Sequence, residues 1–253
     1  MPAIRIYLAG RIAVEIDGRL ALDESKFRGS QPRLVFTYLI MNRGLSVSRD
    51  ELASILWPDR LPSGWDGSLN ALLSRTRSLL AKSIPSGSEW LTLSGGDYLM
   101  SMPSDTWIDV EVLRTSMGDV ESALRSGQQD EAWGPANVAA VIAKRSFLQG
   151  LDGEWISTTR EWLDRQHVRA LECLAIVLMA REQPAPAIEV LSQIITADPY
   201  RESSYQLLIR AFLLEGNRAQ GVLIYNQLRD RLSADLQVEP SPETQAAYQE
   251  LIG

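Results

Sequence analysis

One stretch of the sequence, residues 63–82, carries residue types and spacing that suit contact with a polyanion. On a helix its leucines fall into one stripe, which would pack against a core. The opposite face is small or basic and has no acidic residue between positions 67 and 82; its members are Asn70, Ala71, Ser74, Arg75, Arg77, Ser78 and Lys82. Small side chains alternating with guanidinium groups let a helix lie deep against phosphates and base edges. This face therefore predicts a contact with double-stranded DNA.

A simpler interpretation of the same stripe is an amphipathic helix with one solvated face and no partner. Asp66 lies near the expected start of this helix, three residues after Ser63. That spacing favours a capping role for Ser63 and interaction of Asp66 with the helix dipole over a contact between Asp66 and a base.

Catalytic and metal-binding chemistry find little support in the sequence. It contains no Walker loop, no GxGxxG motif and no pairing of histidine with a serine or cysteine nucleophile. The single cysteine, Cys173, and the single histidine, His167, argue against an internal disulfide and a zinc site made of these residue types. Both are expected to be packing or surface residues, and we expect no enzymatic activity, cofactor or metal.

The composition is that of an ordinary globular chain, with 253 residues, 45% of them hydrophobic and 23% charged. No run approaches the ~20 apolar residues that cross a bilayer. The N-terminus also lacks the basic and apolar regions of a signal peptide. The sequence therefore predicts a cytoplasmic protein without membrane contact.

Charge is divided unevenly along the chain. Residues 1–103 carry 12 Lys+Arg against 10 Asp+Glu, a net charge of +2, whereas residues 104–253 carry 13 against 22, a net charge of −9. This asymmetry indicates that the first part approaches a polyanion and the second part approaches something else. Because the excess of +2 is small, weak non-specific binding to nucleic acid is expected.

The elements that would position the basic helix are a small sheet and two further helices. Alternating apolar residues from Ile4 and the Asp17-Gly18 pair predict short antiparallel strands. A central helix is expected from Ser30 to Gly44. A capping box, Ser48-Arg49-Asp50-Glu51, begins a second helix that ends at Trp57-Pro58.

After the basic helix, two short strands flank Gly95 and Gly96, which predicts a hairpin. The order of sheet, three helices and hairpin is that of a winged helix. In that arrangement the third helix enters the major groove and the hairpin approaches the adjacent backbone. Gly95 and Gly96 are therefore included among the predicted DNA-contacting residues.

The second half contains an internal repeat. An offset of 34 residues aligns Leu171 with Tyr205, Leu174 with Leu208, Leu178 with Phe212, Ala187 with Gly221, Ile188 with Val222, Leu191 with Tyr225 and Ile194 with Leu228. This period and pattern are those of tetratricopeptide helical hairpins. Gly221 and Ser233 depart from the alanine and proline of the consensus, and a last helix, expected from Gln245 to Ile252, would cap the array.

The sequence thus predicts a mainly α fold with a small antiparallel β part. Residues 1–103 would form a winged helix-turn-helix domain for DNA binding. Residues 104–253 would form an all-α domain of tetratricopeptide-like helices.

Two sets of motifs resemble known regulators. The run QPRLVFTYLIMNRGLSVSRDELASILWPD followed by SLNALLSRTRSLL resembles the OmpR-like winged helix of bacterial transcription regulators. FLQGLDGEWISTTREWL, ITADPYRESSYQLLIRAFLLEGNRAQGVLIYNQLRDRL and VEPSPETQAAYQELI resemble, in that order, the bacterial transcriptional activator domain. Together the two halves resemble the Streptomyces antibiotic regulatory protein family. The resemblance implies a transcriptional activator that binds direct repeats near promoters, often as a pair of protomers, and contacts RNA polymerase.

A different class of function remains open at this stage. Tetratricopeptide arrays present concave surfaces to peptides, so the acidic half could belong to a protein-interaction or ligand-sensing scaffold. In that case the winged helix would be a structural or dimerising module.

Overall fold

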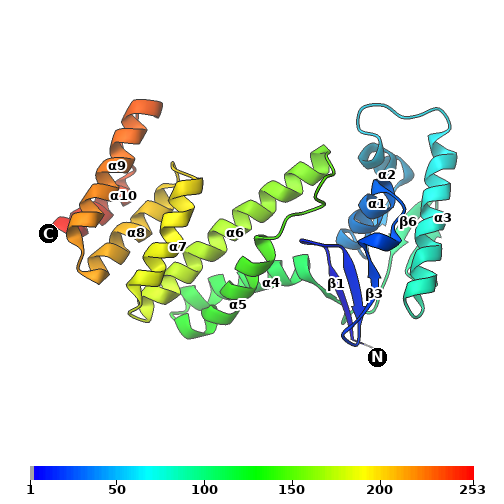
Figure 1. Cartoon of the computed structure of the whole chain (residues 1–253), viewed down its shortest axis with the longest axis horizontal. Coiled ribbons are helices and arrows are strands. Elements are labelled where there is room, and N and C mark those ends of the chain that lie inside the picture. The colour runs from blue at the N-terminus through cyan, green and yellow to red at the C-terminus, as the bar shows by residue number, and fades with distance from the viewer. Residues whose placement is uncertain (1–2) are drawn as a thin grey trace. The chain divides into compact units, whose positions relative to one another are not determined.

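The structure is a computed structural model that describes residues 3–253 (Figure 1). The chain divides into two compact units, each considered by itself. The N-terminal unit reaches Leu113 and also includes Ile142–Asp164, and the second unit consists of Arg114–Val141 and Arg165–Gly253. The division expected from the sequence, into domains of residues 1–103 and 104–253, stays a prediction.

The N-terminal unit opens with the expected small sheet. Its strands are β1 (Ile4–Tyr7), β2 (Ala13–Ile16), β3 (Arg19–Asp23) and β7 (Trp107–Ile108), in the order β3-β2-β1-β7. β1, β2 and β3 pair antiparallel, and positive φ angles of 50° at Asp17 and 76° at Gly18 form the turn between β2 and β3. β7 pairs parallel to β1 and was not anticipated, because two residues are too few to show an alternating pattern.

Three helices follow, α1 (Ser30–Met41), α2 (Arg49–Leu56) and α3 (Trp65–Ser83), with the 3₁₀ helix η1 (Glu24–Lys26) before them. α1 is central, since seven consecutive residues from Leu34 to Ile40 are buried. The capping box at α2 is confirmed in its first half, because the Ser48 side chain accepts a hydrogen bond from the Glu51 amide at 3.1 Å. The Glu51 carboxylate accepts a hydrogen bond from Tyr38 of α1 and so links the two helices.

The prediction that Ser63 caps α3 is wrong. The residue that precedes α3 is Gly64, in the left-handed conformation, and no side chain caps the helix there. Glycine adopts this conformation without the steric cost that a side chain brings. Asp66 does lie in the first turn of α3.

The predicted hairpin is confirmed as β5 (Leu91–Ser94) and β6 (Asp97–Met100), and β4 (Ser46–Val47) adds a third strand beside β6. Gly95 and Gly96 form the two-residue turn, with φ angles of 63° and 97°. Two successive positive φ angles are the requirement of the tight turn that matches the twist of a hairpin.

The N-terminal unit is completed by residues from later in the chain. Asp109 is buried at the start of α4 (Asp109–Arg125), where its carboxylate accepts hydrogen bonds from the backbone amides of Leu8 and Ala9 at 2.9–3.0 Å. Trp155, near the start of α6 (Glu154–Ala180), packs edge-on against Tyr38 at 4.9 Å and Phe147 at 5.5 Å between ring centroids. The run FLQGLDGEWISTTREWL therefore packs against α1 through Trp155.

The second unit is helical. After α5 (Gln129–Ala143) and α6 come α7 (Pro184–Ala197), α8 (Glu202–Glu215), α9 (Arg218–Leu236) and α10 (Pro242–Ile252). α6 with α7 and α8 with α9 are the two predicted repeats (Figure 1), and most of their aligned apolar residues share a core. Val222 and Tyr225 of α9 pack in a second cluster with residues of α10. The expected fold class, mainly α with a small β part, is confirmed.

Both departures from the repeat consensus have a structural counterpart. In the first repeat, α7 ends at Ala197, before Pro199. In the second repeat, which has Ser233 in place of the proline, α9 continues to Leu236. A β-carbon at Gly221 would lie 2.7 Å from a δ-carbon of Leu251, so glycine there lets α10 pack closely against α9. α10 itself begins three residues earlier than expected, with Ser241 as its cap.

Two of the sequence runs quoted above supply polar contacts between these helices. Arg201, after α7, pairs with Glu172 of α6 at 2.9 Å. Glu202, the first residue of α8, accepts hydrogen bonds from the Ser241 amide at 2.7 Å and from the Thr244 hydroxyl at 2.6 Å. Residues 198–202 (DPYRE) and 239–244 (EPSPET), which belong to the second and third runs quoted above, thus meet at the start of α8.

Between residues 3 and 253, no helix combines the length and the apolar composition that crossing a membrane requires.

Candidate nucleic-acid interface

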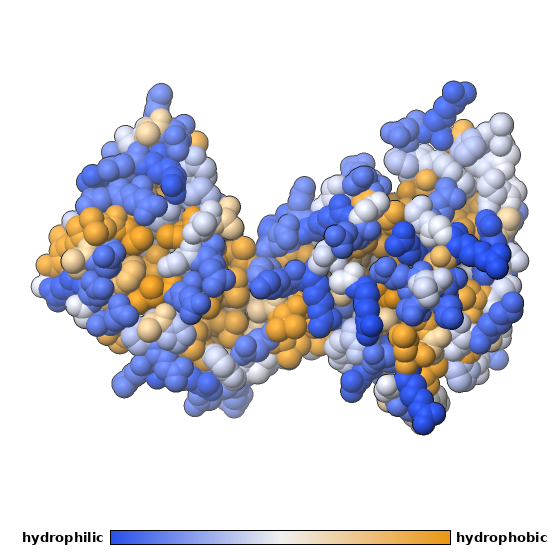
Figure 2. All heavy atoms as spheres, viewed as in Figure 1, coloured by the Kyte–Doolittle hydropathy of each residue, from blue (hydrophilic) through white to orange (hydrophobic). Residues whose placement is uncertain are grey.

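The structure brings most of the predicted contact residues together on the outward face of α3. Its buried side is formed by Leu69, Leu72, Leu73, Thr76 and Leu80. Its exposed side includes Asn70, Ala71, Ser74, Arg75, Ser78 and Lys82. The edge of the N-terminal unit along which α3 runs in Figure 1 is largely pale in Figure 2, with a few blue side chains, as expected for serine, alanine and glycine between cations.

Two cations of this face border a cleft of about 350 Å³ between α3 and the segment that leads into α1. Arg75 and Lys82 line one side, and Lys26 and Arg28 line the other, with Phe27 and Leu79 among the apolar residues. No acidic residue lines the cleft, and within residues 3–253 no carboxylate forms an ion pair with any of these four cations. Asp23 interacts electrostatically with Lys26 but does not line the cleft. The lining is therefore positively charged, which suits phosphate groups.

Arg77 lies apart from the other predicted residues. It is half-buried, and its Nε donates to the backbone carbonyl of Leu91 in β5 at 2.9 Å. Arg75, two residues earlier, is exposed and its Nε bonds to the Ala71 carbonyl of its own helix at 3.2 Å. The expectation that Arg77 shares the exposed face is therefore not met, because Arg77 points towards the hairpin and ties it to α3.

Gly95 and Gly96 lie at the exposed tip of the hairpin, on a different element from the α3 face. A β-carbon added at either residue would meet no atom within 4 Å. The tip is therefore slender, which would let it approach a nucleic-acid backbone closely.

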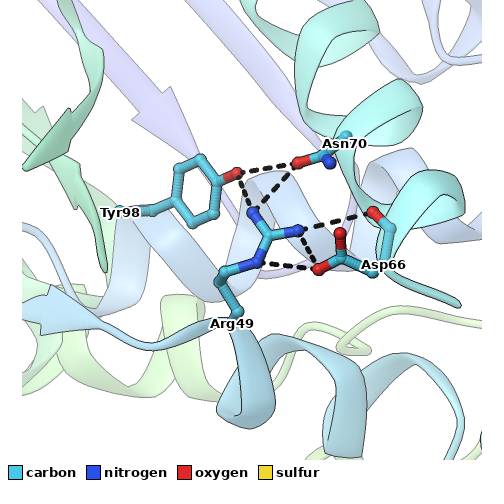
Figure 3. A network of polar contacts seen from close by, with 4 residues as sticks. All are labelled: Arg49, Asp66, Asn70 and Tyr98. Atoms are coloured by element: carbon cyan, nitrogen blue, oxygen red, sulfur yellow. Dashed lines mark hydrogen bonds and ion pairs between the residues drawn. The ribbon is translucent and has the colours of Figure 1, made fainter. Parts of the chain in front are cut away.

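A polar network that the sequence did not predict connects α2, α3 and the hairpin (Figure 3). The Arg49 guanidinium donates from Nε to Asp66 Oδ1 at 3.0 Å, and from Nη1 to Asn70 Oδ1 and to the Tyr98 hydroxyl, both at 2.9 Å. Nη2 bonds to the Asp66 carboxylate and, at 3.4 Å, to the Asp66 carbonyl. Hydrogen bonding to Asp66 raises the pKa of Arg49 above its ordinary value, so this side chain stays charged.

The chain matches known proteins in sequence and in fold. The model of the bacterial transcriptional activator domain matches residues 108–252, which is more than half of the chain. Regulatory protein AfsR of Streptomyces coelicolor is 24% identical over 251 residues, which cover 99% of this chain and 24% of AfsR. Transcriptional regulatory protein EmbR of Mycobacterium tuberculosis is 24% identical over 221 residues, which cover 87% of this chain and 57% of EmbR.

Transcriptional regulator RedD of S. coelicolor is 23% identical over 259 residues, which cover 96% of this chain and 71% of RedD. The chain thus spans about a quarter of AfsR (24%) and 57% of EmbR. Among solved structures, M. tuberculosis EmbR in complex with a low-affinity phosphopeptide matches with a TM-score of 0.88 at 23% identity, over 100% of this chain and 65% of that one. That likeness shows a shared fold.

These relatives are transcriptional regulators, and the resemblance to the Streptomyces antibiotic regulatory proteins is confirmed. With more than half of its length matched to one family model, the chain belongs to the bacterial transcriptional activator domain family.

Proposed function

We propose that this protein is a sequence-specific DNA-binding transcriptional regulator that acts as an activator. The observation that carries the proposal is the exposed face of α3, which combines small side chains with cations. Asp66, in the first turn, is the one acidic residue of this helix. In a winged helix such a helix enters the major groove, where base edges are read. The relatives named above, which are transcriptional regulators, support the same role.

The cleft beside α3 supplies the phosphate contacts in this proposal. Its cations are directed from both α3 and the segment before α1, so a DNA strand bordering the major groove can be held along it. The slender tip at Gly95 and Gly96 would approach the backbone on the hairpin side. Arg77 contributes by fixing the hairpin to α3 through Leu91, with its remaining N–H groups available to a phosphate.

We further propose that two protomers bind adjacent direct repeats. Residues 1–103 have a net charge of only +2, so a single copy should bind DNA weakly. Two linked contacts raise the overall affinity without any new interaction within each half-site. The acidic second part, with a net charge of −9, would face protein, and RNA polymerase is the partner proposed.

The test uses the full chain and fragments of bacterial genomic DNA from organisms that carry relatives of this protein. Fragments retained against competitor DNA are sequenced and then footprinted at several salt concentrations. We expect a recurring motif of two direct repeats, protected in a salt-dependent manner. If no fragment is retained above competitor DNA at any salt concentration, the DNA-binding proposal is wrong and a protein-interaction scaffold becomes the better account.

A further inference from the structure

The amide of Asn70 has two chemically different ends, and the structure determines which of them faces outward. Its Oδ1 accepts hydrogen bonds and its Nδ2 donates two. Asn70 is exposed on the face of α3 proposed to enter the major groove. The end that faces outward therefore decides which base edges this residue can read.

Arg49 and Tyr98 fix this orientation. Arg49 Nη1 donates to Asn70 Oδ1 at 2.9 Å, and the Tyr98 hydroxyl donates to the same oxygen at 3.5 Å. A guanidinium carries donors alone, so an amide turned the other way would place Nδ2 against N–H groups and lose the bond. Figure 3 shows the Asn70 nitrogen on the side away from the guanidinium.

The Arg49 guanidinium, which orients Asn70, is itself held by hydrogen bonds to several residues. The five hydrogen bonds from Arg49 to Asp66, Asn70 and Tyr98 equal the five N–H groups of a guanidinium. The Arg49 side chain is 25% exposed, and Tyr98 is buried in β6, two residues after the hairpin turn. Arg49 is therefore a positioning residue whose donors are already engaged within the protein.

Resting on the proposed DNA binding, we propose that Arg49 and Tyr98 hold Asn70 as an outward hydrogen-bond donor that reads base acceptors. In the major groove guanine presents two acceptors, N7 and O6, and thymine presents one, O4. Adenine presents one acceptor, N7, beside the N6 donor, and cytosine presents a donor. A freely turning asparagine instead favours adenine, to which it bonds through both ends. Because Oδ1 is engaged, that two-ended pairing with adenine is lost.

The experiment selects bound duplexes from a randomised library with the full chain and with three variants, Asn70→Ala, Asn70→Asp and Tyr98→Phe. In the parent we expect guanine or thymine at one position of the motif, with cytosine disfavoured. Asn70→Ala should reduce discrimination at that position by about five- to tenfold. Asn70→Asp, which presents an acceptor outward, should shift the preference there to cytosine, while Tyr98→Phe should weaken the preference at that same position.

A further variant, Arg49→Met, removes the 2.9 Å hydrogen bond to Asn70 Oδ1 and so frees the amide to turn. Its circular dichroism melting curve shows whether it folds. If it does not fold, Tyr98→Phe and the two Asn70 variants carry the test. Tyr98→Phe keeps the buried ring and removes the longer of the two hydrogen bonds to Asn70 Oδ1, so its effect should be smaller. A preference of the parent for adenine over guanine at the Asn70 position overturns the inference, because it points to pairing through both ends of the amide. An unchanged motif in Asn70→Ala overturns it as well. A parent that selects no motif at all contradicts the proposed function itself, which is a distinguishable result.

Discussion

Glu172 shows how a single carboxylate can connect two repeats. It receives hydrogen bonds from Nε and Nη2 of Arg201 and from the hydroxyls of Ser203 and Ser204, at 2.7–3.1 Å. Burial raises the pKa of Glu172, but these donors outweigh burial, so its pKa lies below the ordinary value of 4.5. The folded protein therefore stabilises the ionised carboxylate of Glu172 relative to the unfolded chain.

This shift predicts a pH dependence. A lowered folded-state pKa adds stability that is complete above the unfolded pKa and is lost as pH falls below it. Glu172→Gln should reduce the free energy of unfolding by roughly 1–3 kcal/mol at pH 7, and the difference from the parent should shrink between pH 5 and pH 3. Urea unfolding followed by circular dichroism measures it, with the exposed Glu189→Gln as a control. A difference that stays constant with pH would contradict the role given to Glu172.

Two arginines of α3 show what the sequence can and cannot reveal about a site residue. The helical pattern correctly separates the buried leucines from the exposed Arg75. Arg77 lies at the border of the two faces, and its placement depends on a carbonyl of β5 that no helical pattern contains. The partners of Arg49 lie 17, 21 and 49 residues away in sequence, so local spacing gave no signal for the network around Asn70.

The strands and helices, too, divide into those that a local sequence pattern predicts and those that depend on distant residues. Strands, helices and the hairpin turn carry periodic or glycine signals of their own, and these elements were predictable. β7, with two residues, and the packing of the 142–164 segment into the N-terminal unit depend on tertiary contacts such as those of Trp155 and Asp109. Such contacts join residues far apart in the chain and leave no local pattern.

The tether at the start of α8 gives a prediction for α10. Glu202 accepts bonds from the first residues of the α10 capping segment, at Ser241 and Thr244. Glu202→Ala should therefore weaken the docking of α10 by about 1–2 kcal/mol, because an amide and a hydroxyl lose a charged acceptor. Hydrogen–deuterium exchange of the α10 amides should become about five- to thirtyfold faster.

The control for that prediction is Glu215→Ala, which removes an exposed carboxylate at the other end of α8. It should leave exchange in α10 close to that of the parent. Equal acceleration in the two variants, or none in Glu202→Ala, would show that Glu202 does not hold α10.

For the molecule as a whole, the division of charge fits a protein with two kinds of partner. The α3 face and its cleft are cationic, although residues 1–103 as a whole are close to neutral. In the second unit, apolar atoms are visible on the face of the part that holds α7 to α10 (Figure 2). DNA affinity in this account therefore depends on a few local cations and on a second protomer, and little on the total charge.

In the proposed function, the exposed face of α3 and the adjoining cleft bind DNA. The most direct test of this binding compares two doubly substituted full-length chains on the duplex selected above. Arg75→Ala with Lys82→Ala removes two cations of the cleft, and Arg5→Ala with Arg19→Ala removes two exposed cations of the small sheet. The measured quantity is the dissociation constant at several salt concentrations, because each phosphate contact contributes about one unit to the logarithmic salt slope.

For the α3 pair we predict a salt slope lower by about two units and a loss of affinity of roughly 1–3 kcal/mol for each residue that contacts DNA. The sheet pair should bind like the parent. Equal slopes and equal affinities for the two doubly substituted chains would contradict the proposal, because the charge removed is the same and the location alone differs.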